Sequence, residues 1–176
     1  MNWFNPVSKI SWILAGVGMA MVVNTASAAT TTGTFAVKAT IAKNCVIDSS
    51  SVSLLDFGNY DPLSATPLDT AQGNIVVRCT KNTTFDIGLN AGIGAGATVA
   101  TRKMNNGTDN LNYSLFTTAA RTTVWGNTVG TDTVTGTGTG LGAAQTVSKT
   151  VFGRVLAGQD VSAGTYNDTI TVTVTF

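Results

Sequence analysis

Residues 166–176 of the chain read YNDTITVTVTF. One face of this stretch carries Ile170, Val172, Val174 and Phe176, and the other face carries threonines at the alternate positions. Because side chains alternate across a strand, this pattern predicts a half-buried β-strand. The alternation continues to the last residue without a turn or a polar tail, although most domains fray or become polar at a terminus. We therefore expect this strand to need a partner, and a second chain is one possible source.

Residues 1–28 have the features of a secretory signal peptide. Lys9 supplies the positive charge, residues 10–23 form a mostly apolar stretch, and Ala26-Ser27-Ala28 fits an A-x-A cleavage site. The alternative is a membrane anchor, but the apolar stretch is short for a span and no second one follows. We expect cleavage after Ala28, which leaves residues 29–176 as one domain with no integral membrane segment.

The composition limits the possible partners and reactions. The chain has 10 Lys and Arg, 9 acidic residues and no His, and every acidic residue is Asp. Without a basic cluster, nucleic acid is not an expected partner. Without His or Glu, the common general bases reduce to Asp, so we expect no enzyme activity.

The two cysteines, Cys45 and Cys79, both follow the expected cleavage site. In an exported chain, an even count of two predicts one structural disulfide. A redox pair or a metal site is the alternative, but C-x-x-C is absent and no His is present to complete a zinc site.

Short alternating segments predict an all-β protein. After a first candidate strand at residues 34–41, the further candidates are residues 46–55, 73–79, 85–89, 111–116, 147–156 and 166–176. Several short strands separated by turn residues favour an antiparallel sandwich. Residues 91–100 and 126–142 are rich in glycine, and we expect each to form a long loop or a loosely packed edge hairpin.

Two other motifs are weak. Residues 138–143 fit the dinucleotide pattern G-x-G-x-x-A, but a strand is expected after them where a helix is needed. Residues 109–112 offer oxygen ligands but lack the spacing of a calcium loop, so a solvated turn is expected. We therefore expect no cofactor and no metal.

With the strands placed, a set of motifs occurs in order along residues 29–176. It comprises Asn44-Cys45, the segments 55–60, 75–79, 102–104, 111–116 and 151–155, the G-x-Y-x-D-T motif at 164–169 and the final T-V-x-F. In this set the chain resembles the spore coat protein U domain family, which includes subunits of the archaic chaperone–usher pili of Gram-negative bacteria.

The resemblance implies an incomplete immunoglobulin-like antiparallel β-sandwich that lacks its final strand. A periplasmic chaperone would lend this strand, and the N-terminal extension of a neighbouring pilus subunit would replace it at the outer-membrane usher. The alternating side chains of Phe35, Val37, Ala39 and Ile41 suit such a donor strand, within the bracket 30–41. The final strand, Ile170 to Phe176, would lie beside the acceptor groove.

The expected function is therefore a structural subunit of a surface pilus that supports adhesion and biofilm formation, secreted through the periplasm. An ordinary first strand, packed within its own chain, is the alternative for Phe35–Ile41. A self-contained secreted β-sandwich that binds carbohydrate or serves as a surface coat protein is the alternative for the whole chain. Trp125 is the candidate stacking ring for a sugar, although packing beneath its loop is the role that we expect for it.

Overall fold

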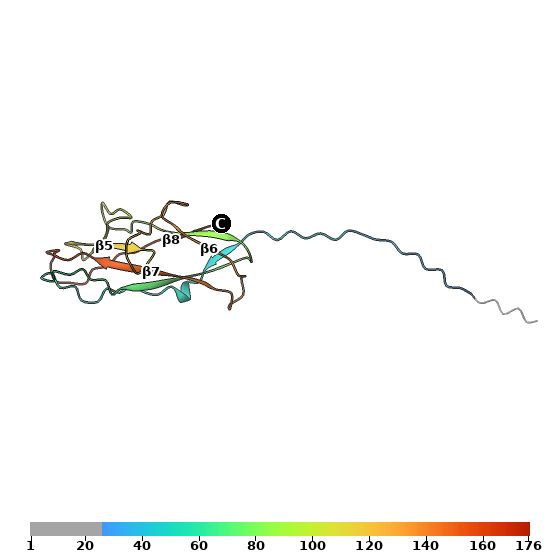
Figure 1. Ribbon diagram of the computed structural model, residues 1–176, viewed down its shortest axis with the longest axis horizontal. Coiled ribbons are helices and arrows are strands. Elements are labelled where there is room, and N and C mark those ends of the chain that lie inside the picture. Colours follow the sequence, from blue (N-terminus) through green and yellow to red (C-terminus); the bar gives the residue numbers. More distant parts are fainter. Residues whose placement is uncertain (1–25) are drawn as a thin grey trace, which may run out of the picture. The chain divides into compact units, whose positions relative to one another are not determined.

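The computed structural model describes residues 26–176. Most of the expected signal peptide, residues 1–25, lies outside this part of the chain. The chain divides after Ala39 into two units, which are described separately. Within the first unit, residues 26–39 run as an extended trace without helix or strand (Figure 1).

The second unit, Thr40–Phe176, contains two antiparallel sheets. The larger sheet has the strand order β1-β2-β7-β5-β4 and the smaller has the order β6-β3-β8. The strands are β1 (Cys45–Ile47), β2 (Gln72–Cys79), β3 (Thr84–Leu89), β4 (Arg102–Asn105), β5 (Asn110–Phe116), β6 (Val134–Thr137), β7 (Val147–Val155) and β8 (Val172–Thr175), and a short 3₁₀ helix η1 spans Ser49–Ser51. The predicted all-β antiparallel fold is confirmed.

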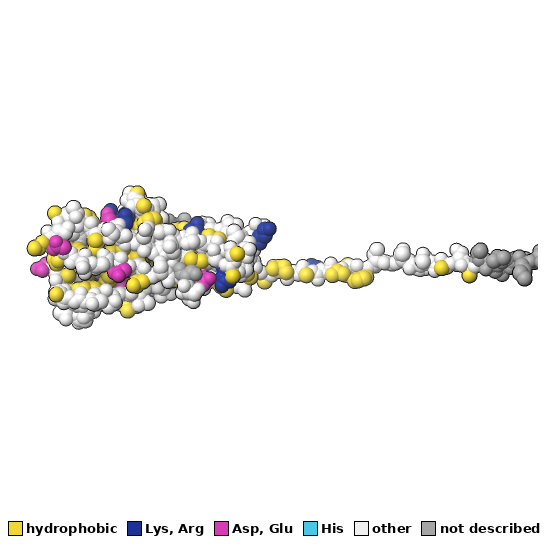
Figure 2. All heavy atoms as spheres, turned by 90° about the horizontal axis from the view of Figure 1, so that it is seen from below, with side chains coloured by type: hydrophobic (Ala, Val, Ile, Leu, Met, Phe, Trp, Pro, Cys, Tyr) yellow, Lys and Arg dark blue, Asp and Glu magenta, His cyan; other side chains and the backbone are white. Residues whose placement is uncertain are grey.

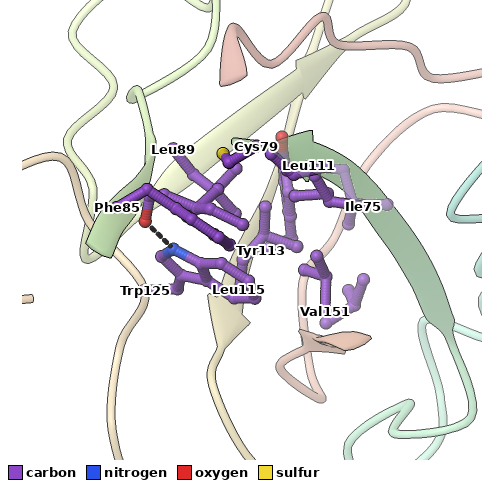
Figure 3. Close-up of a cluster of buried hydrophobic side chains, with 12 residues drawn as sticks. Ile75, Cys79, Phe85, Leu89, Leu111, Tyr113, Leu115, Trp125 and Val151 are labelled. Carbon is purple, nitrogen blue, oxygen red and sulfur yellow. Dashed lines mark hydrogen bonds between the residues drawn. The ribbon is translucent and has the colours of Figure 1, made fainter. Parts of the chain in front are cut away.

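The core lies between the two sheets. β2, β3, β5 and β7 each turn alternate apolar residues inward, as half-buried strands do, and Ile75, Ile87, Leu115 and Val155 are among those buried. Figure 3 shows Trp125 packed in this cluster, where its indole N–H donates a hydrogen bond of 2.8 Å to the carbonyl oxygen of Ile87.

The predicted disulfide is confirmed. Cys45 in β1 and Cys79 in β2 are directly opposite each other in the ladder and form the bond. It closes the loop 45–79, which contains the irregular segment between β1 and β2, and joins β1 to the buried strand β2.

The glycine-rich segment 126–142 was predicted to be a long loop or a loosely packed edge hairpin. It contains an edge strand, β6, which pairs with β3 from Val134 to Thr137, and the rest of the segment lies outside any strand. A Cβ atom at Gly136 would clash with the ring of Phe85, so β6 can approach β3 this closely only because residue 136 is a glycine. Strand β4, at Arg102–Asn105, was not predicted from the sequence.

The expected strand at 166–176 is shorter in the structure. Only Val172–Thr175 pairs as a strand, with Val172 opposite Leu89 and Thr175 opposite Asp86. Residues 166–171 lie outside this ladder: Asn167 forms an isolated antiparallel bridge with Asn105 at the end of β4, and the side chain of Asp168 accepts hydrogen bonds from the backbone N–H groups of Ile93 and Thr169. The alternation of half-buried and exposed side chains nevertheless runs unbroken from Tyr166 to Thr175.

Candidate functional site

A groove of about 910 Å³ lies in the second unit, beside the small sheet. Residues 52–60 line one of its sides, and residues 161–168 with Ile170 and Val172 line the other. Its floor is the core itself, through the side chains of Ile75, Leu89, Leu111, Tyr113, Leu115 and Val151. The groove thus opens directly onto the hydrophobic core.

The first wall, residues 161–172, runs into a strand with a free edge. β8 is the terminal strand of the β6-β3-β8 sheet and pairs only with β3 among the described residues. In an antiparallel sheet, alternate backbone N–H and C=O groups of an edge strand point away from its neighbour and stay available for another strand. β8 therefore presents unpaired backbone groups along its outer edge.

The second wall is the segment Val52–Tyr60, which lies across the inner face of the large sheet. Phe57 packs edge-on to Tyr113 with ring centroids 5.8 Å apart. A Cβ atom at Gly153 would lie 2.7 Å from the ring of Phe57, so this glycine in β7 makes room for the wall. The backbone groups of Leu54 to Phe57 make no hydrogen bond to any other part of the described chain.

A buried tyrosine and an aspartate connect the first wall to the large sheet. The hydroxyl of Tyr113 donates to Oδ2 of Asp168 at 2.7 Å, and the N–H of Ile93 donates to Oδ1 at 2.8 Å. Burial, followed by the hydrogen bond to the Asp168 carboxylate, raises the pKa of Tyr113 far above its usual value. Tyr113 therefore stays neutral and remains a donor at any physiological pH.

A second aspartate holds the start of the same wall. Oδ2 of Asp109 accepts hydrogen bonds from the N–H and the hydroxyl of Ser162, at 2.9 and 2.5 Å. These two bonds hold the pKa of Asp109 below its usual value. The hydroxyl of Tyr166 donates to the carbonyl oxygen of Ser162 at 2.8 Å, so the loop between them is braced from both ends.

Arg102 is fully buried close to this wall and makes its hydrogen bonds only with backbone carbonyl groups. Its guanidinium donates to the oxygens of Leu89, Asn90, Val99 and Trp125, over distances of 2.7–3.0 Å. Burial lowers the pKa of Arg102, and the neighbouring Tyr113, Asp168 and Asp132 oppose that shift. The arginine thereby joins β4 to three chain segments, at residues 89–90, 99 and 125.

The predicted acceptor residues fall into two groups. Ile170 and Val172 line the groove, and together with Val174 they pack against the core. Val174 does not line the groove, and Phe176 is 49% exposed. The assignment of all four as acceptor-strand residues remains a prediction.

The predicted donor residues lie outside any strand. Phe35, Val37 and Ile41 are 87%, 83% and 82% exposed, and Ala39 is exposed as well. Figure 2 shows hydrophobic side chains at the surface of this extended segment. The residues are therefore available for burial, and their donor role remains a prediction.

The alternative functions find little support in the geometry. Trp125 is 0% exposed and hydrogen-bonded, so its ring cannot stack on a sugar. The glycine pattern at 138–143 leads into strand β7 and not into the helix that a dinucleotide site requires. Among residues 26–176, no three His, Cys, Asp or Glu side chains are grouped to hold a metal, and no helix is long and apolar enough to cross a membrane.

Several groove residues escaped the sequence analysis, chiefly Leu55, Phe57, Tyr113 and Asp168. Asp168 did leave a signal, because it has the same parity as Ile170 and Val172 and so falls on the inward face. A carboxylate at such a position needs a hydrogen-bond partner, which Tyr113 supplies. Leu55 and Phe57 likewise alternate with the exposed Asp56, but the turn residues that follow masked the pattern.

Residues 31–173 match the Spore Coat Protein U domain. The chain belongs to this family. It is also 39% identical to Protein U of Myxococcus xanthus over 162 residues, which cover 86% of this chain and 88% of that protein. The predicted family is thus confirmed, and the family agrees with the prediction that the chain is not an enzyme.

Among solved structures, this Spore Coat Protein U domain chain resembles a chain of the CsuC–CsuE chaperone–tip adhesion subunit pre-assembly complex from the archaic chaperone–usher Csu pili of Acinetobacter baumannii. The TM-score is 0.52 at 23% identity, and the match covers 78% of this chain but 40% of that chain. At this identity, the comparison supports the fold and says nothing further of function.

Proposed function

We propose that this protein is a structural subunit of an extracellular pilus and that its groove takes a donor strand from another polypeptide. The observation that carries the proposal is the groove, which opens onto the core between two walls with unpaired backbone groups. An added strand would hydrogen-bond to these walls and place alternate side chains against the apolar floor of the groove, which is the geometry of strand addition.

The segment 30–41 has the form that such a groove requires. Phe35, Val37, Ala39 and Ile41 recur at every second position, so all four side chains of an extended strand point to one side. The distance from Phe35 to Ile41 in an extended strand is about 20 Å. This segment carries large apolar side chains that are exposed in the free chain. Exposed apolar groups of this size usually mark an interaction site.

The route of assembly follows from this role. Residues 1–28 direct export and are removed, a periplasmic chaperone fills the groove first, and a neighbouring subunit then replaces the chaperone at an outer-membrane usher. A chain from a complex of a chaperone with a tip adhesion subunit shares this fold, and that is the support for a chaperone as the first partner. The finished fibre lies on the surface of a Gram-negative bacterium, where it serves adhesion and biofilm formation.

The test is deletion of residues 30–41 from the exported chain. The shortened subunit should still co-purify with its chaperone, because the acceptor groove is intact, but it should form no fibres. Exported wild-type chain in the same strain is the control. Fibres of the deleted chain in the electron microscope would contradict the proposal.

A second candidate is a self-contained secreted coat protein, which the identity with Protein U and the family's name favour. The state of the purified protein distinguishes the two. A strand-exchanged polymer gives a heat-resistant ladder on an unboiled gel, whereas a coat module would be a stable monomer without a co-purifying partner.

A further inference from the structure

The groove carries charge of one sign only. Asp56 and Asp168 are the charged residues among those that line it, and no Lys or Arg lines it. Asp168 is already engaged, because its two oxygens accept hydrogen bonds from Tyr113, Ile93 and Thr169. Asp56 is exposed, and only its Oδ1 accepts a hydrogen bond, from the N–H of Gly58 at 2.8 Å.

Asp56 stands on the outer side of its wall. Leu55 and Phe57 are half-buried and pack against the core, whereas Leu54 and Asp56 are exposed. A strand inserted beside this wall would therefore place its inward side chains next to Leu55 and Phe57 and its outward ones next to Leu54 and Asp56. The opposite wall offers no competing outward charge, because β8 and its approach turn Thr171, Thr173 and Thr175 outward.

The donor segment carries charge of the opposite sign. Lys38 is the only charged residue between Ala29 and Ile41. It alternates with Val37 and Ala39, so it points outward when Val37 and Ala39 point into the groove. The same chain thus holds one free outward carboxylate on the acceptor and one outward ammonium group on the donor.

We propose that the groove takes the Phe35–Ile41 segment of a second copy of this chain, in the register that sets Lys38 opposite Asp56. This inference rests on the proposed function and adds to it the identity of the donor and its alignment. In this register, Val37 and Ala39 lie against Leu55 and Phe57. A shift by one residue would turn all the apolar side chains outward, and a shift by two would separate Lys38 from Asp56.

The test uses the full exported chain as Lys38→Asp, as Asp56→Lys and as both together. Each single variant creates like charges at every joint of a homopolymer, and the double variant restores an opposite pair. Ladder formation by each single variant should be roughly 2- to 5-fold slower than in wild type, and the double variant should recover the wild-type rate. A mixture of the two single variants should also recover, because an alternating polymer has opposite charges at both kinds of joint.

Lys43→Asp is the matched control, since it makes the same charge change outside the inserted segment. It should slow assembly less than Lys38→Asp, and Asp56→Lys should not rescue it. Lys38 and Asp56 are both exposed in the free chain, so their substitution should not affect folding. Lys38→Gln and Asp56→Asn form a second pair of variants, in which the charges are removed and not reversed.

Four outcomes would overturn this proposal, and they are distinguishable. If the purified wild-type chain is a stable monomer without a co-purifying partner, the proposed function fails and this inference fails with it; if it is a monomer that co-purifies with a chaperone and forms no ladder, only donation by a second copy fails. If wild-type ladders form but the single variants assemble at the wild-type rate, only the register is wrong. If each variant is slow and neither the double variant nor the mixture recovers, the two charges act independently, and Lys38 does not face Asp56.

Discussion

Truncation of single donor side chains gives the most direct measure of the groove's strength. The perturbation is Phe35→Ala, Val37→Ala or Ile41→Ala in the full exported chain, compared with Thr34→Ala and Thr40→Ala on the other side of the same strand. The first three positions are predicted to enter the groove and the two threonines to stay outside it.

The expected magnitude follows from the exposure of these side chains in the free chain. Phe35, Val37 and Ile41 are each more than 80% exposed, so nearly all of their apolar surface is available for burial on insertion. Full burial of one such side chain is worth about 1.5–3 kcal/mol. Each truncation should therefore weaken the joint between subunits roughly 10- to 150-fold, because about 1.4 kcal/mol corresponds to a factor of ten.

The assay is the loss of preassembled ladders in rising guanidinium concentration, followed on unboiled gels. The three inward truncations should lower the midpoint of dissociation, with the threonine variants close to wild type. Equal midpoints for the inward and outward variants would refute the assigned phase of the donor strand. Wild-type midpoints throughout the series would refute insertion of this segment altogether.

Three further predictions concern the body of the subunit. Unfolded wild-type protein should show no free thiol, and a reactive thiol in it would exclude the disulfide. Cys45→Ser should leave the thiol of Cys79 free and cost about 3–4 kcal/mol of stability. Arg102→Met removes the donor from two buried carbonyl oxygens, those of Leu89 and Trp125, at about 1–3 kcal/mol each, and from the part-buried oxygens of Asn90 and Val99, so the denaturant midpoint should fall; an unchanged midpoint would show that water replaces the guanidinium. The hydrogen bonds from Arg154 hold the pKa of Asp69 below its usual 3.8, so the stability from this pair is present above pH 3.8 and is lost as the pH falls through the lowered pKa. In Asp69→Asn, the denaturant midpoint should therefore fall less steeply on acidification than in wild type, whereas an identical fall would assign the acid sensitivity to other carboxylates.

The alternation of side chains was sufficient to predict much of the fold. Segments such as 73–79 and 111–116 form strands β2 and β5 within a residue or so of the predicted ends, because their apolar faces are buried in one continuous core. The disulfide was also accessible, since two cysteines in an exported chain leave one pairing. In each case the signal and its physical cause are local in sequence.

β6 shows why other parts could not be predicted in this way. Its residues, Val134 to Thr137, lie in a glycine- and threonine-rich stretch that resembles a flexible loop in composition. The reason for Gly136 is the ring of Phe85, which is about fifty positions away in the chain. The composition shows that residue 136 has no side chain, but it cannot show that the ring of Phe85 is the reason.

The groove was the least predictable feature, because its walls come from opposite ends of the domain. Residues 52–60 contain turn signals and form no strand, yet Phe57 reaches β7 at Gly153 and β5 at Tyr113. The sequence indicated the final strand and the donor segment, but not the residues that hold the two walls apart.

The tie between Tyr113 and Asp168 explains how the groove can stay open over an apolar floor. An unsupported wall would close over the apolar floor of the groove, since burial of apolar surface is favourable. Asp168 prevents this because its carboxylate is fixed by the Tyr113 hydroxyl and the N–H of Ile93, and moving the wall would break hydrogen bonds to a charged group. Asp109 fixes the other end of the wall through Ser162. In the proposed assembly, an incoming strand would meet a preformed groove, and more of the free energy of burying its side chains would remain to hold the joint together.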